Sequence, residues 1–132
     1  MKNAGFVLLA VVVTLLSAAV AAEPVAAGVS DSKTVRCLNL HQIDQMTIVD
    51  NRNLLFETPN HTYYLNTLPR ACGTLQRSSA IMYRVSQNEL CNLDFITVLD
   101  PIGSGFIKGP SCALGTFKPI SKVEASALLK RH

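Results

Sequence analysis

Residues 46–66 read MTIVDNRNLLFETPNHTYYLN, and this stretch decides the fold. Two runs of turn-forming residues divide it, Asp-Asn-Arg-Asn at 50–53 and Thr-Pro-Asn-His at 58–61. Apolar residues alternate with polar ones or cluster on either side of these runs, a pattern typical of short strands. The stretch therefore predicts an antiparallel meander. Its three strands are expected at 46–50, 54–56 and 62–66.

Three further strands are expected after the meander, at 81–85, 95–99 and 112–120. The apolar run at 95–99 predicts a strand buried on both faces. Pro119 places the last strand at a sheet edge or marks its end. Residues 68–77 are expected to form a loop or one helical turn that carries Cys72. Residues 100–111 hold three glycines and two prolines and predict a long loop.

The C-terminal residues predict one helix. Ser121 and Glu124 have the spacing of a capping box, in which each residue binds the backbone N–H of the other. Val123, Ala127 and Leu128 are expected on one helical face. A helix of about ten residues is too short to be stable alone, so it must dock on the sheet. The fold class expected is mainly β (α+β): a small antiparallel sheet or partly open barrel of about six strands with one C-terminal helix.

The N-terminal residues predict a secretory signal peptide at 1–22. Lys2 precedes an apolar run at 6–16 and a small-residue end at 17–22, the three parts of such a signal. The alternative is an uncleaved anchor, although the apolar segment is at the short limit for a spanning helix. Residues 23–35 lack large apolar groups and are expected to be a disordered lead-in. A single domain is then expected at 36–132, in the periplasm or secreted.

The four cysteines predict two disulfides, because an export signal delivers them to an oxidising compartment. Four cysteines allow three pairings, and sequence alone does not choose among them. We favour Cys72–Cys91, which closes a local loop, and Cys37–Cys112, which ties the start of the domain to its last strand. A redox pair or a zinc site is disfavoured, since neither a C-x-x-C motif nor finger spacing occurs.

Charge excludes some classes of partner. Removing the signal takes away Lys2 and leaves 11 basic residues (12 − 1) against 9 acidic ones, a net charge of +2 (11 − 9). The only basic run is Lys130-Arg131, and nucleic-acid binding usually needs a basic patch or stripe. We therefore expect no nucleic-acid partner, no electrostatic binding to anionic membranes and no stable membrane anchor once the signal is cleaved.

No motif specifies a reaction, a cofactor or a metal. The histidines lack metal-site or catalytic spacing, and the aspartates at predicted strand ends are expected to cap turns. The Gly103-Ser104-Gly105 run lacks the spacing of a nucleophile elbow. Phe106, a large aromatic in the predicted glycine-rich loop, is either packed on the core or offered to a partner. The residues considered are His41, His61 and His132, and Asp44, Asp50, Asp94 and Asp100.

A pattern spread over most of the domain resembles a family of small exported proteobacterial proteins, a domain of unknown function. The resemblance covers residue 37 to about residue 121 and implies a bacterial envelope location, with no activity or catalytic residue to transfer. The residues that carry it are Tyr64-Leu65-Asn66, Leu68-Pro69, Cys72, Leu75, Tyr83-Arg84, Leu90-Cys91, Asp94, Ile96, Val98, Cys112, Leu114-Gly115 and Phe117.

The function expected is that of a non-enzymatic binding or structural module in the cell envelope, with a protein or small-molecule partner. The alternative is a small periplasmic hydrolase or lyase that uses Asp and His residues in a cleft. Convergence of Asp94 or Asp100 with His41 or Arg84 would favour the enzyme, and an exposed Phe106 would favour the binding module.

Overall fold

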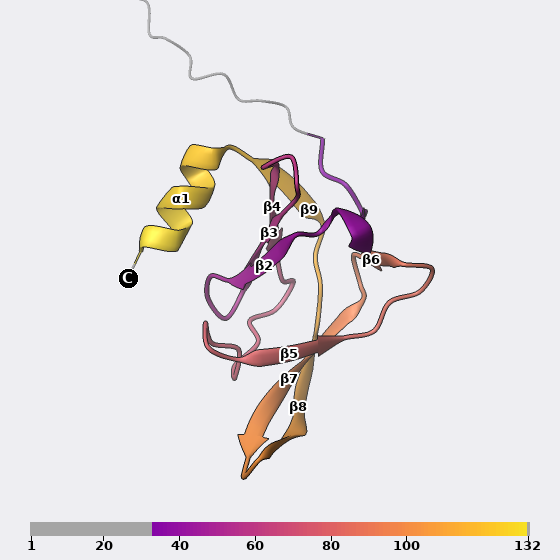
Figure 1. The fold of residues 1–132 in the computed structure, drawn as a ribbon, viewed down its shortest axis with the longest axis vertical. Helices are drawn as coiled ribbons and strands as arrows, with labels where there is room; N and C mark the ends of the chain where they lie inside the picture. The colour runs from indigo at the N-terminus through magenta and orange to yellow at the C-terminus, as the bar shows by residue number, and fades with distance from the viewer. Residues whose placement is uncertain (1–32, 132) are drawn as a thin grey trace, which may run out of the picture.

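The computed structural model describes residues 33–131. The predicted signal peptide, most of the predicted lead-in and His132 lie outside these residues. The described part is mostly β: nine strands form three antiparallel sheets, and one helix ends the chain (Figure 1). The predicted class, mainly β with one C-terminal helix, is confirmed. The sheets do not close into a barrel.

A four-stranded sheet contains the predicted meander. Its first three strands are β2 (Gln45–Ile48), β3 (Asn53–Glu57) and β4 (Tyr63–Thr67), in chain order. The turn between β2 and β3 forms because the Asp50 carboxylate accepts backbone N–H groups of Arg52 and Asn53 at 2.7 and 2.9 Å. The fourth strand, β9 (Phe117–Ile120), pairs with β4 and brings the end of the domain back to the meander.

A three-stranded sheet replaces the loop expected at 100–111. Its strands are β5 (Ala80–Tyr83), β7 (Phe95–Ile102) and β8 (Gly105–Ala113). The prediction of a long loop was wrong, because glycine and proline are tolerated in the edge strand β8 and at the turn, where Gly103 has a φ of 56°. The β7–β8 hairpin extends away from the helix and from the four-stranded sheet (Figure 1).

A two-stranded sheet joins β1 (Cys37–Asn39) to β6 (Glu89–Cys91), and a short 3-10 helix, η1 (Leu40–Gln42), follows β1. Strands of three residues are too short to show an alternating pattern, so sequence reasoning missed both. Just before β1, Val35 exchanges two backbone hydrogen bonds of 2.9 Å with Phe117.

The disulfides are Cys37–Cys91 and Cys72–Cys112. Two intramolecular disulfides are confirmed, but the favoured pairing of Cys37 with Cys112 and Cys72 with Cys91 was wrong. The reason lies in the strands that were missed: β1 and β6 place Cys37 directly opposite Cys91 in register.

The main core lies where the three sheets meet. Each sheet contributes buried apolar side chains to it, and Phe56 of β3 packs edge-to-face on Phe117 of β9 with ring centroids 5.2 Å apart. In β7 only one face is buried, since Ile96 and Val98 are buried whereas Phe95 is 58% exposed. The expectation that this strand is buried on both faces was therefore wrong.

The other face of the four-stranded sheet is covered by α1 (Lys122–Lys130). The capping box is confirmed: Glu124 N–H donates to Ser121 Oγ at 3.2 Å, and Ser121 N–H donates to Glu124 Oε2 at 2.8 Å. The predicted helical face was wrong in part, because Ala125 and Leu128 pack on the sheet whereas Val123 is 79% exposed.

The helix is also held at its C-terminal end. The guanidinium group of Arg77 donates to the backbone carbonyls of Leu128 and Leu129 at 3.3 and 3.5 Å, and to that of Val49 at 3.1 Å. A cation at this end satisfies free carbonyls and opposes the helix dipole. The loop between β4 and β5 thus ties α1 to the turn that follows β2.

Candidate functional site

The outer face of the three-stranded sheet carries a row of one methionine and two hydroxyl side chains. Register places Met82 of β5, Thr97 of β7 and Ser111 of β8 side by side. Side chains alternate along a strand, so this row lies opposite the buried Ile96 and Val98. The hydroxyl groups of Thr97 and Ser111 are 2.7 Å apart and share a hydrogen bond.

A groove of about 620 Å³ runs over this row, a size that accommodates small-molecule ligands. We call it the outer groove. Arg84 and Lys108 contribute its two cations, and neither makes an ion pair or a side-chain hydrogen bond within residues 33–131. Its lining residues are Met82, Arg84, Val85, Ser86, Asp94, Phe95, Thr97, Lys108, Gly109 and Ser111.

The only carboxylate of the outer groove within the described chain is Asp94, and it already has a structural role. Its Oδ2 accepts the backbone N–H of Cys91 at 2.7 Å, and its own N–H donates to the Cys91 carbonyl at 3.1 Å. Asp94 therefore closes the turn between β6 and β7, as predicted for the aspartates at strand ends. Asp94 nevertheless lines the same groove as Arg84. A shared site for these two residues is one of the arrangements that would favour an enzyme.

The other predicted acid–base residues lie elsewhere. Asp100 lies within β7 and lines a second hollow of about 640 Å³ together with Phe106. His41, in η1, lines a third hollow of about 210 Å³, and its Nε2 lies 2.6 Å from Asn88 Nδ2. The structure thus brings neither aspartate together with His41.

His61 belongs to a small polar network on the turn between β3 and β4. Its Nδ1 lies 3.0 Å from Glu57 Oε1, which also accepts the hydroxyl of Tyr63 at 3.0 Å. These hydrogen bonds from His61 and Tyr63 hold the pKa of Glu57 below its usual value, and the same carboxylate raises the pKa of Tyr63. His61 itself is 73% exposed, as expected for a surface residue.

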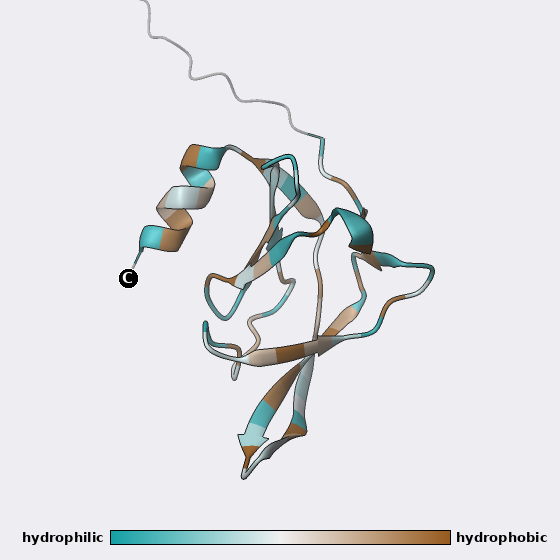
Figure 2. Ribbon diagram, in the orientation of Figure 1, coloured by the Kyte–Doolittle hydropathy of each residue, from teal (hydrophilic) through white to brown (hydrophobic). Residues whose placement is uncertain are grey.

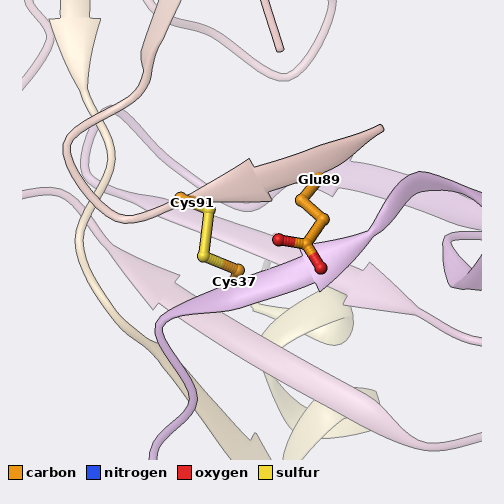
Figure 3. Close-up of side chains that lie close together, drawn as sticks. All are labelled: Cys37, Glu89 and Cys91. Carbon is orange, nitrogen blue, oxygen red and sulfur yellow. A yellow bond between two sulfur atoms is a disulfide. The ribbon is translucent and has the colours of Figure 1, made fainter. Parts of the chain in front are cut away.

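One cluster brings together residue types that can bind a metal ion, but its two cysteines are not free to act as ligands. Cys37, Cys91 and Glu89 place a sulfur or oxygen atom each within 4.8 Å of one another (Figure 3). The two sulfurs are joined in a disulfide, so neither is a thiolate that could bind a metal. The exposed Glu89 carboxylate alone does not make a site.

Exposed apolar side chains concentrate on the same part of the molecule as the outer groove. Of the eight large apolar residues that are exposed among residues 33–131, six lie between positions 83 and 107 and two lie on α1. Phe106 is one of the six and is 61% exposed, so its side chain is not packed into the core. The six residues are Tyr83, Leu93, Phe95, Ile102, Phe106 and Ile107.

Sequence reasoning singled out Phe106 but missed most of the outer groove. Lys108, Ser111 and Thr97 become neighbours only through the pairing of β7 with β8. The signal that could have revealed them was the polar–apolar alternation along β8, which Gly109 and Pro110 interrupt. Leu93 was also missed; its φ of 76° is unusual for a residue with a side chain and marks the tight turn before β7.

Fold and site together define a small β-rich domain with two disulfides and an open polar groove. The disulfides indicate an oxidising compartment. No helix among residues 33–131 is long and apolar enough to cross a membrane.

The chain belongs to a family of unknown function, DUF6491, whose model matches residues 1–132. The resemblance to a domain of unknown function is confirmed in this respect. No curated protein and no solved structure matches the chain.

Proposed function

We propose that the chain is an exported, non-enzymatic binding module of the bacterial cell envelope, and that its outer groove holds a small anionic ligand. Export is supported by the signal-like residues 1–22 and by the two disulfides. The observation that carries the ligand class is the pair of unpartnered cations, Arg84 and Lys108, in one groove of about 620 Å³.

The chemistry of the groove suits a carboxylate or a phosphate group. Arg84 offers a planar fork that binds either anion through two parallel hydrogen bonds, and Lys108 offers a second positive charge. The hydroxyl pair of Thr97 and Ser111 lines the groove and can donate to the same anion. Phe95, which is exposed and lines the groove, offers an apolar contact for the rest of the ligand.

Binding is tested by titrating the isotope-labelled exported protein with glycerol phosphate and, separately, with succinate. We expect amide resonances of residues in the outer groove to shift with one of the two probes. The probe that causes the shift shows whether the groove prefers a phosphate or a carboxylate. Arg84→Gln with Lys108→Gln should weaken binding by about tenfold or more. The matched control, Lys130→Gln with Arg131→Gln, removes the same charge from the end of the chain and should leave binding unchanged.

Two outcomes contradict the proposal. If neither probe shifts the groove resonances at millimolar concentration, the groove is not an anion site. If the control variant weakens binding as much as the groove variant, the protein attracts anions only through its net charge.

The alternative of a small hydrolase or lyase is favoured by one observation, the shared groove of Asp94 and Arg84. Against it, the Asp94 carboxylate is used to close the turn at Cys91, and no histidine of residues 33–131 lines the groove. Release of inorganic phosphate from glycerol phosphate in the same titration, abolished by Asp94→Asn, would establish the enzyme instead.

A further inference from the structure

The β7–β8 hairpin ends in an apolar tip, which we define as residues 101–107. It exposes Ile102, Phe106 and Ile107 by 58%, 61% and 52%. Figure 2 shows this apolar colour at the far end of the hairpin, away from the rest of the domain. Side chains of this size are normally covered, and their exposure together on one projecting element marks a contact surface.

The apolar side chains lie on both faces of the hairpin tip. Phe106 and Ile107 are neighbours in β8, so their side chains point to opposite faces. Pro101, paired with Phe106, adds to one face; Phe106 and Ile107 each keep more than half of their surface exposed, although Phe106 also borders the second hollow. A partner with a flat surface would cover one face only, whereas a fluid apolar medium surrounds the tip.

The charges of the hairpin argue in the same direction. Asp100 precedes the tip and Lys108 follows it, so the hairpin carries one negative and one positive charge at its end. An electrostatic partner would require an excess of one sign. The tip is therefore suited to an apolar surface that does not depend on charge.

We propose that the hairpin tip inserts reversibly into the surface of a lipid bilayer. This proposal rests on the exposed tip and does not require an anion in the outer groove, although Lys108 lines that groove and also borders the tip. Insertion is shallow, because β8 is an edge strand whose free backbone groups need water or headgroups and cannot enter the hydrocarbon core. The long side chain of Lys108 lies just behind the tip, where its ammonium group can stay among the headgroups.

The chain contains no tryptophan, so a single tryptophan can report on the tip. The test uses protein recovered from the cell envelope, with Phe106→Trp as the reporter and Val123→Trp as the matched control on exposed α1. Each is mixed with phosphatidylcholine vesicles, then with vesicles containing phosphatidylglycerol. Both proteins carry the same N-terminal segment, so a difference between them reports the tip alone.

We expect the emission of the Phe106→Trp protein to shift to shorter wavelength and to be quenched by brominated lipid, while the Val123→Trp protein shows neither change. Adding Ile102→Ser and Ile107→Ser should weaken vesicle binding by about tenfold for each side chain. Salt and phosphatidylglycerol should change binding little, because the tip has no net charge.

Three results would overturn the proposal. If the emission of the Phe106→Trp protein is the same with and without vesicles, the tip does not enter lipid. Binding that requires phosphatidylglycerol and disappears with salt is electrostatic adsorption rather than insertion. A wavelength shift that appears without vesicles and grows with protein concentration assigns the tip to a contact with a second copy of the chain.

Discussion

At the scale of single residues, the most informative side chain is Asn66, which is fully buried among apolar neighbours. Its side-chain amide pairs with the backbone of Gly115 as a strand neighbour would. Gly115 N–H donates to Asn66 Oδ1 at 2.8 Å, and Asn66 Nδ2 donates to the Gly115 carbonyl at 2.7 Å. Gly115 has to be glycine here, because a side chain would collide with the carbonyl oxygen of Thr67. The pair fixes the segment between β8 and β9 against β4.

Asn66→Ala should lower the free energy of unfolding by about 3 kcal/mol, since it leaves a cavity and removes the partners of two partly buried backbone groups of Gly115. Asn60→Ala is the matched control, because Asn60 is exposed in the turn after Thr58 and should change stability by less than about 0.5 kcal/mol. Urea denaturation of both variants measures the difference. Equal midpoints would show that neither the hydrogen bonds nor the volume of Asn66 contributes to stability.

At the scale of elements, the best prediction from sequence was the helix start, because a capping box is a local signal read within four residues. Ser121→Ala should therefore lower the free energy of unfolding by about 1 kcal/mol. Ser104→Ala, at the exposed turn of the β7–β8 hairpin, is the matched control and should have no measurable effect. Thermal or urea midpoints of the two variants provide the measurement. An unchanged midpoint for Ser121→Ala would mean that water replaces the cap at no cost.

Elements that depend on distant partners were harder to predict than the helix cap. The meander at 46–66 was identified because short turns join its strands, so strands that are neighbours in sequence are also paired in the sheet. β1 and β6 have three residues each and exist because they pair across 54 residues of chain, which no local pattern shows. The disulfide pairing and the outer groove both depend on such distant strand pairs, and for that reason sequence reasoning missed them.

At the scale of the whole molecule, three carboxylates report on acid stability. Burial alone would raise the pKa of Asp50, but hydrogen bonds from Asn53 and from the backbone of Arg52 outweigh it and hold the pKa below 3.8. The bonds from His61 and Tyr63 hold the pKa of Glu57 below 4.5. The backbone and hydroxyl of Ser121 do the same for Glu124.

All three groups favour the folded state in the ionised form. Their stabilisation is complete above the ordinary pKa values of 3.8 and 4.5 and is lost as the pH falls through the lower values of the folded state. We expect the free energy of unfolding to be level from about pH 7 to pH 5 and to fall below about pH 4.5. The variant with Asp50→Asn, Glu57→Gln and Glu124→Gln should show a shallower acid slope in urea titrations. A slope equal to that of the unchanged protein would assign acid sensitivity to other groups.

The connectivity of the disulfides has a consequence for how the protein matures. Along the chain, the cysteines at 37, 72, 91 and 112 alternate between the two bonds, so the two loops that the bonds close overlap in sequence. A chain that enters an oxidising compartment with its N-terminus first presents Cys37 and Cys72 before either native partner arrives. A bond formed at that stage is wrong and must be reshuffled by thiol–disulfide exchange. For a chain exported in this way, we expect maturation to be faster with an isomerase that reopens early bonds than with an oxidant alone.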